Sequence, residues 1–247
     1  EEDKLLNSNG KLREINDKYA KINSDIEATK SRVKVLENIE ATYGWLPEGI
    51  RNFVHQLKGK SVDGTVSDFI KSKPGYEKAI ESALGEKLKW ILINDKENTI
   101  STIQKFKETC TGRGTFISLD NRRVAGGSLE IDQIRIMDCI ECNQENRPFL
   151  ASILADTYIT ESILEAIKAR DKFPSFNFVT KDGEFFDSNG SISVGSAPDN
   201  ILQIKDEIKD LNDQKAKFDN EMDLIQIEIK DIEEEIFNIN KRIESFN

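Results

Sequence analysis

The sequence predicts an α/β (α+β) globular domain of two similar subdomains, flanked by two long helices that pair as an antiparallel coiled coil. Three observations predict this fold. Both ends of the chain carry a heptad repeat of apolar residues, no proline interrupts either repeat, and short helix-like and strand-like segments alternate between them. The 247 residues suffice for one or two domains.

The C-terminal repeat keeps one register from Ile201 to Phe246. Steps of three and four residues alternate over about six heptads, the pattern of a helix in a left-handed supercoil. Lys215 alone breaks the apolar series. The repeat positions are Ile201, Ile204, Ile208, Leu211, Lys215, Phe218, Met222, Ile225, Ile229, Ile232, Ile236, Ile239, Ile243 and Phe246.

The N-terminal repeat is weaker but continuous, with nine of its twelve positions apolar or aromatic. At a rise of about 1.5 Å per residue, each arm would extend roughly 60 Å. Because the two lengths match and both arms adjoin one segment, we expect the arms to pair within one chain; the alternative is pairing between copies. The positions are Leu5, Ser8, Leu12, Ile15, Tyr19, Ile22, Ile26, Thr29, Val33, Leu36, Glu40 and Tyr43.

The central segment begins where Gly44 and Pro47 end the first arm, and Trp45 and Leu46 are expected to plug the base of the domain. Period-two and helical patterns then alternate. For the first half they predict helices at 50–57, 76–84 and 99–107 and strands at 62–66, 90–93 and 115–119. Ile100, Ile103 and Phe106 are expected to fall on one side of the third helix.

A similar second half follows a polar, turn-rich connection at 120–147. The patterns predict helices at 149–154 and 161–169, a strand at 157–159, and a hairpin of 176–180 with 184–186 around a turn at 181–183. The predicted division is therefore an arm at 1–43, subdomains at 44–128 and 129–198, and an arm at 199–247.

The charge distribution lacks the strongly basic character of a dedicated nucleic-acid-binding protein. Lys and Arg number 8 against 9 Asp and Glu in residues 1–43, 7 against 14 in 199–247, and 20 against 22 between them. A solvated coiled-coil surface explains the acidic arm, so DNA contact would need a local basic patch. The sequence has no signal peptide and no apolar run of membrane-spanning length. Both ends of the sequence fall within a heptad, which favours the interpretation that it is a piece of a protein with longer coiled coils.

Candidate chemistry is sparse. Cys139 and Cys142 form a CxxC pair that could hold zinc between two copies, but ordinary structural cysteines are favoured, and three cysteines indicate a reducing compartment. The only histidine, His55, lies on a predicted helix. The glycine-rich run at 112–115 lacks the Gly-Lys-Ser/Thr ending of a phosphate-binding loop.

The segment from Gly190 to Ser196 is the strongest functional candidate. One interpretation is a flexible linker. The other is an edge strand whose small residues let a second backbone approach closely and pair with it.

Four motifs, in order, resemble one known family. They are YEKAIESALG at 76–85, GRGTFISLD at 112–120, VTKDGE at 179–184 and GSISVGS at 190–196, between two coils. This arrangement resembles the hinge of a bacterial SMC (structural maintenance of chromosomes) protein with stubs of its coiled-coil arm. The resemblance covers essentially all of residues 44–198.

The resemblance implies a homodimer. SMC hinges join head to tail into a ring with two interfaces, each pairing an edge strand of one subdomain with the other subdomain of the partner. Gly190 and Gly195 match the family's glycine pattern, whereas Asn189 and Val194 stand where glycine is usual. The implied interface residues are Gly190, Ser191, Ile192, Ser193, Val194 and Gly195, facing Thr115, Phe116 and Ile117 within 115–119.

The resemblance also implies a role in chromosome condensation and segregation, in the cytoplasm at the nucleoid. ATP, Mg and a kleisin subunit would bind at distant ATPase heads, so we expect this chain to have no enzymatic activity, cofactor or metal. Weak, salt-sensitive DNA contact is a hypothesis; a zinc-clasped linker and a nucleic-acid-binding module remain alternatives. The candidate DNA-binding residues are Arg122, Arg123, Lys168, Arg170 and Lys172, with Lys87 and Lys89 also considered.

Overall fold

A computed structural model describes residues 2–94, 97–118, 131–154, 156–195 and 199–246. The chain divides into two compact units, each of which is described by itself. One combines Glu1–Asn38 with Glu207–Asn247, and the other is Ile39–Asp206. The predicted domain boundary at 128/129 lies outside the described residues, and the predicted division stays a prediction.

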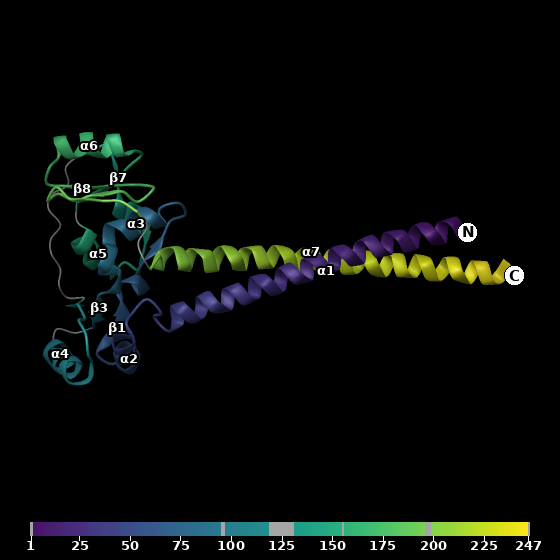
Figure 1. The fold of residues 1–247 in the computed structure, drawn as a ribbon, viewed down its shortest axis with the longest axis horizontal. Helices are drawn as coiled ribbons and strands as arrows, with labels where there is room; N and C mark the ends of the chain where they lie inside the picture. Colours follow the sequence, from purple (N-terminus) through teal and green to yellow (C-terminus); the bar gives the residue numbers. More distant parts are fainter. Residues whose placement is uncertain (1, 95–96, 119–130, 155, 196–198, 247) are drawn as a thin grey trace. The chain divides into compact units, whose positions relative to one another are not determined.

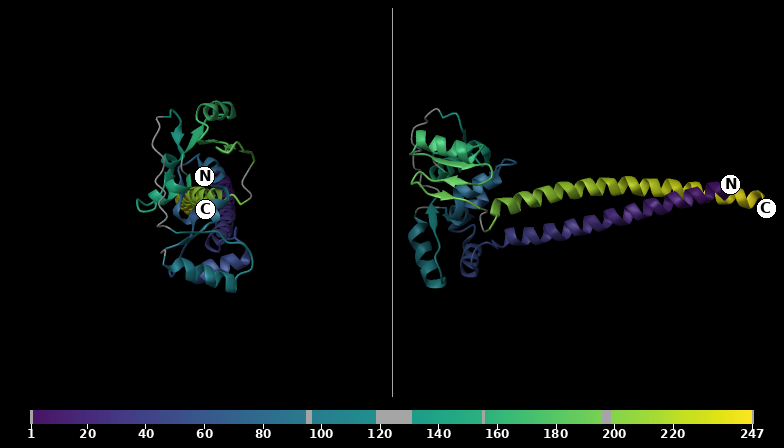
Figure 2. Two further views of the ribbon diagram at one scale, coloured as in Figure 1. Left: turned by 90° about the vertical axis from the view of Figure 1, so that its left-hand side faces the viewer. Right: turned by 45° about the horizontal axis from the view of Figure 1, so that its top comes forward.

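The first unit is a pair of antiparallel helices. Helix α1 (Glu2–Ala41) and helix α7 (Ile201–Phe246) run side by side in this unit, and both chain termini lie at the same end (Figures 1 and 2). Contacts between the helices fix their register, because Gln226 Nε2 donates to Tyr19 Oη at 3.4 Å and Arg32 Nε donates to Glu207 Oε1 at 2.8 Å. The predicted pairing within one chain is confirmed.

Both apolar seams are confirmed residue by residue. The buried residues of α1 all fall on its predicted positions, and so do those of α7 beyond its first turn. They are Ser8, Ile15, Ile22, Ile26, Thr29, Val33 and Leu36 in α1, and Met222, Ile225, Ile232 and Ile239 in α7. Burying each isoleucine contributes about 1.5–3 kcal/mol. The exception, Lys215, is half-buried and forms an ion pair with Asp219 at 2.7 Å.

The second unit contains a three-stranded sheet in the order β1-β3-β4. Strand β3 pairs antiparallel with β1 and parallel with β4, so helix α4 forms the crossover of a parallel βαβ unit. The elements are α2 (Glu48–Leu57), β1 (Val62–Thr65), β3 (Ile91–Ile93), α4 (Asn98–Thr109) and β4 (Phe116–Ser118).

A five-stranded sheet in the order β10-β9-β8-β7-β5 completes the second half. Its parallel pair, β7 and β8, is joined by helix α6, which repeats the βαβ arrangement of the first half. Helix α6 covers one face of this sheet, and α3 and α5 lie on the other (Figure 1). Helix α3 (Glu77–Leu84) comes from the first half of the sequence. The other elements are β5 (Ile134–Arg135), α5 (Arg147–Leu154), β7 (Thr157–Thr160), α6 (Ile163–Lys172), β8 (Asn177–Thr180), β9 (Phe185–Phe186) and β10 (Ile192–Ser193).

The sequence predicted only a turn-rich connection at 120–147. This is wrong for the described residues 131–147, which contain short strands. β5 joins the large sheet, and β6 (Ile140–Glu141) pairs with β2 (Lys71–Ser72). Strands of two residues are too short to give an alternating pattern. Three single-turn helices complete the second unit: η1 (Val66–Phe69), η2 (Gly85–Lys89) and η3 (Ile136–Cys139).

One main core runs through both halves of the second unit. Val54, Ile80 and Leu92 from the first half pack in the same cluster as Leu150 and Val179 from the second. Tyr43, Trp45 and Leu46 are buried in that cluster, which confirms the predicted plug. A smaller cluster beneath α6 contains Tyr158, Ala166, Ala169, Phe176, Phe178 and Phe186.

Helix α4 is present as predicted and buries only part of its apolar side. Phe106 and Thr102 face the core, but Ile100 is 71% exposed and Ile103 is 37% exposed. The helix therefore presents two isoleucines to the surface, where burial within this chain does not explain them.

Candidate dimer interface

The segment from Gly190 to Gly195 forms one edge of the five-stranded sheet. Within it, β10 pairs antiparallel with β9, placing Ile192 opposite Phe186 and Ser193 opposite Phe185. All six residues are exposed; Ile192 retains 50% and Val194 73% of its accessible surface. An edge strand with little side-chain packing of its own can pair with a further strand.

Gly190 and Gly195 are required by the backbone. Their φ angles are +93° and +110°, which residues with a Cβ rarely adopt. A Cβ at either position would meet nothing within 4 Å. The space beside both glycines is therefore open in this chain, and a second backbone could approach it.

The predicted facing segment, 115–117, is also at a sheet edge. Strand β4 is the last strand in the order β1-β3-β4, and the Thr115 carbonyl accepts a hydrogen bond from Ile91 N at 2.8 Å. Phe116 and Ile117 are half-buried, and the Phe116 ring packs edge-on against Phe106 with centroids 5.1 Å apart. The chain does not pair β4 with β10, because they belong to different sheets.

The basic candidates do not form one group. Arg122 and Arg123 lie outside the described residues. Lys168 and Lys172 are exposed on α6, whereas the Arg170 guanidinium lies 5.8 Å from the Phe186 ring centroid.

The two further lysines have partners within the chain. Lys87 Nζ donates to the Ile153 carbonyl at 2.9 Å, and burial lowers the pKa of Lys87. Lys89 forms an ion pair with Asp199 at 2.6 Å. Both lysines therefore stabilise contacts within the second unit.

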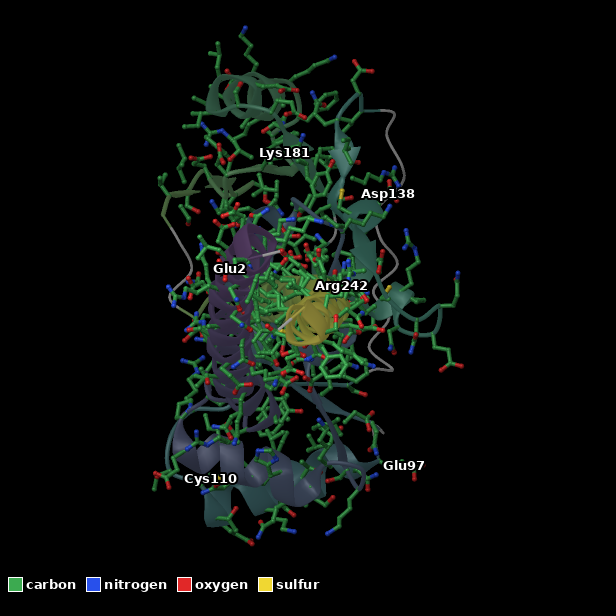
Figure 3. All side chains as sticks on the ribbon, turned by 90° about the vertical axis from the view of Figure 1, so that its right-hand side faces the viewer. Glu2, Glu97, Cys110, Asp138, Lys181 and Arg242 are labelled. Carbon is green, nitrogen blue, oxygen red and sulfur yellow. The ribbon has the colours of Figure 1, made fainter. Side chains whose placement is uncertain are left out.

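The cysteines do not assemble into a site. Cys139 is buried, which raises the pKa of its thiol, and Cys110 Sγ donates to the Gly49 carbonyl at 3.4 Å. Cys110 and Asp138, the neighbour of Cys139, lie far apart in Figure 3. Within the described ranges, no group of three or more His, Cys, Asp and Glu side chains is arranged to hold a metal ion.

The segment that follows the C-terminal end of α1 is held by a partly buried hydrogen-bond network, which the sequence patterns did not reveal. Tyr43, at φ +51°, donates its hydroxyl to Asp68 Oδ2 at 2.6 Å and accepts from Lys58 Nζ at 2.5 Å. Asp68 also accepts from Thr65 N at 2.9 Å. A Cβ on Gly64 would lie 2.1 Å from Asp68 Oδ2, so only glycine fits there.

The first turn of α7 contacts a buried carboxylate, that of Glu81. Gln203 Nε2 donates to Glu81 Oε2 at 3.1 Å, whereas the buried Oε1 has no hydrogen-bond partner among the described residues. Burial raises the pKa of this carboxyl. Lys205 Nζ donates to the Ser67 carbonyl, and desolvation lowers the pKa of Lys205. An acidic residue next to Ile80 on the apolar side of α3 was the one available signal in the sequence.

Residues 59–170 match the family model "SMC proteins Flexible Hinge Domain". Among curated relatives, "Chromosome partition protein Smc" of Myxococcus xanthus is 26% identical over 88% of this chain, and that of Aquifex aeolicus is 31% identical over 70%. The chain spans only 19% and 16% of the length of these relatives.

Solved structures show the same fold. The hinge domain of Geobacillus stearothermophilus SMC, described as an asymmetric dimer, matches with a TM-score of 0.79 at 19% identity, covering 94% of this chain and 98% of that one. The Pyrococcus furiosus Smc hinge domain with an extended coiled coil matches with a TM-score of 0.54 at 25% identity, covering 98% and 95%.

No helix in the described part of the chain combines the length and the apolar character that crossing a membrane would require. The matched family and structures are hinges rather than catalytic domains. The chain therefore belongs to the SMC family as a hinge domain flanked by coiled-coil helices.

Proposed function

We propose that this chain is the homodimerisation module of a chromosome-organising SMC ATPase. Two copies join head to tail, with β10 of each copy pairing to β4 of the other, and so link two coiled-coil arms. The observation that carries this proposal is that the three-stranded and five-stranded sheets end in the short strands β4 and β10, and that β10 is exposed along its whole length.

Strand addition at these edges has a clear physical basis. An added strand supplies main-chain hydrogen bonds, and the surrounding side chains supply specificity. Gly190 and Gly195 leave room for the incoming backbone. The Geobacillus relative, which is described as an asymmetric dimer, supports dimerisation.

A head-to-tail dimer contains the same contact twice. Once one contact has formed, the second is intramolecular and benefits from a high effective concentration. Two small interfaces would therefore hold together more firmly than either alone.

The relatives named chromosome partition proteins support a role in chromosome condensation and segregation. We infer that ATP, Mg and a kleisin subunit bind parts of such proteins that lie beyond the matched length. On this proposal the assembly works in the cytoplasm at the nucleoid. This chain links two coiled-coil arms and does not catalyse a reaction.

Light scattering of glycine variants tests the proposed interface. Gly190→Glu and Gly195→Glu should each give monomers, because a charged side chain would fill the open space beside the edge. Gly59→Glu is the matched control, since Gly59 has a φ of +75° and an equally open Cβ position away from both edges. Two dimeric edge variants would refute the assignment.

DNA contact is the weaker part of the proposal and rests on the exposed lysines of α6. Lys168→Ala with Lys172→Ala should weaken binding to a fluorescent duplex in anisotropy titrations, and raising salt from about 50 to 200 mM should abolish binding by both proteins. The control is Lys217→Ala with Lys230→Ala on α7. Tight binding that survives the higher salt would contradict this part.

A further inference from the structure

The tripeptide Ser-Asn-Gly occurs twice in the chain, and the structure gives the two copies different backbones. Residues 8–10 lie within helix α1, and residues 188–190 lie in the loop that joins β9 to β10. An asparagine followed by glycine readily loses its side-chain amide, because glycine has no Cβ to keep its backbone nitrogen away from the asparagine carbonyl. The two copies therefore separate what the sequence contributes to this reactivity from what the fold contributes.

The copy in helix α1 is held away from this reaction. Asn9 Nδ2 donates to the Leu5 carbonyl at 2.9 Å, and the neighbouring Ser8 is buried. The Gly10 nitrogen belongs to the helical hydrogen-bond ladder. For this nitrogen to reach the Asn9 side chain, consecutive hydrogen bonds of the helix would have to break.

The copy between β9 and β10 lies in an exposed turn. Gly190 N donates to the Asp187 carbonyl at 2.9 Å, which closes a β-turn over residues 187–190 with Asn189 at its third position. Asn189 and Gly190 are both exposed. A short, solvent-exposed turn opens locally at little cost, because few hydrogen bonds and few buried contacts hold it.

Asp187 holds both groups that would react. Its carbonyl accepts from the Gly190 nitrogen, and its side-chain Oδ1 accepts from Asn189 Nδ2 at 2.6 Å and from Asn189 N at 2.7 Å. An amide that donates to a carboxylate in a charge-assisted hydrogen bond has a less electrophilic carbonyl carbon. The nearby negative charge also opposes the negative charge that develops during attack. Both effects slow the reaction while the turn is closed.

We propose that Asn189 is a site of spontaneous deamidation and that Asp187 sets its rate. The Gly190 nitrogen loses its proton and bonds to Asn189 Cγ. The Cγ–Nδ2 bond breaks, and the amide group takes up a proton and leaves as ammonia. Water then adds to either carbonyl carbon of the cyclic imide, which opens to aspartate or isoaspartate. Water is the only co-reactant, and no oxidant or reductant is consumed.

The product would weaken the turn from which it forms. Deamidation replaces the amide that donates to Asp187 Oδ1 at 2.6 Å with a second carboxylate, and like charges at such a distance repel. Isoaspartate would also lengthen the backbone just before Gly190. The modification therefore changes the charge and the shape of the loop that leads into β10. This inference rests on contacts within one chain.

Mass spectrometry of the purified chain tests the site. The protein is kept in warm, mildly alkaline buffer, with a parallel sample in concentrated urea, and conversion of Asn189 and Asn9 is followed in proteolytic peptides. Because the tripeptides are identical, both asparagines should convert at similar rates in urea. In the folded protein, Asn189 should convert several-fold faster than Asn9. Equal rates in the folded protein, or an Asn189 that stays unchanged there, would overturn the site.

Variants of Asp187 test its control of the rate. Asp187→Ala should raise the rate at Asn189 roughly tenfold in the folded protein, the effect of losing one charge-assisted hydrogen bond, and should leave the rate in urea unchanged. Asp187→Asn keeps an acceptor without the charge and should give an intermediate rate. Asp182→Ala, which removes an exposed carboxylate from the preceding turn, is the control. An unchanged rate in Asp187→Ala, or an equal increase in Asp182→Ala, would overturn the role of Asp187.

Discussion

The side-chain amide of Gln203 donates to the Glu81 carboxylate at 3.1 Å. Gln203 lies in the first turn of α7, a helix of 46 residues, and Glu81 is buried in α3. A negative charge near a helix N-terminus opposes the positive end of the helix dipole. Helix α3 therefore holds the start of the C-terminal arm.

Removing this carboxylate should destabilise the globular unit. Glu81→Ala would remove the acceptor of the Gln203 side-chain amide at the start of α7, so we expect the free energy of unfolding to fall by about 1–3 kcal/mol. Urea denaturation measures the loss. The control is Lys78→Ala, an exposed position on the same helix. An unchanged midpoint for Glu81→Ala would contradict this role.

The same carboxyl should make stability depend on pH. Burial raises the pKa of Glu81 above its ordinary value, so the folded state holds the proton more tightly than the unfolded state does. The resulting stabilisation is complete below the unfolded pKa and is lost as pH rises through the folded pKa.

Glu81→Gln keeps an acceptor but does not ionise. We therefore expect the variant to gain stability relative to the unmodified protein as pH rises from about 4 to 7. Denaturation curves across this range supply the comparison. A difference that stays constant with pH, or that moves the other way, would exclude Glu81 as the source.

The hydrogen bond between Tyr43 and Asp68 should stabilise the segment that follows α1. Tyr43→Phe keeps the packed ring but removes a hydroxyl that joins Lys58 to Asp68, and we expect a loss of about 1–2 kcal/mol in the free energy of unfolding. Tyr76→Phe, at a half-buried ring elsewhere in the unit, is the control. Equal stability of the two variants would argue against the network.

Lys215 is the one polar residue in the C-terminal heptad repeat, and an apolar residue can replace it. Lys215→Ile would restore the heptad pattern, and we expect about 1 kcal/mol of added stability from the newly buried side chain. Lys217→Ile, exposed and off the seam, should not stabilise the protein. Thermal unfolding followed by the helical signal compares them. A lower midpoint for Lys215→Ile would mean that the ion pair with Asp219 matters more than the apolar contact.

The sequence alone predicted those features that repeat over many residues. The seam positions from Ile15 to Ile239 follow from period and length, and most helices and strands of the centre follow from their local patterns. Two-residue strands such as β6 escaped prediction because they contain no complete period.

The remaining features depend on contacts between distant residues. Ile100 and Ile103 show a helical apolar pattern, which gave no sign that they would face outward. The pairing of Glu81 with Gln203 joins residues 122 positions apart, and no local pattern records it. An edge strand was one of two interpretations of the small residues at 190–196, and the strand order is what distinguishes them.

Sedimentation equilibrium of the unmodified chain tests the central claim most directly. The account predicts a particle of twice the 28.1 kDa of one chain at micromolar concentration, and its mass should fall to that of one chain in Gly190→Glu. An unmodified chain that stays at 28.1 kDa up to high concentration would contradict the account.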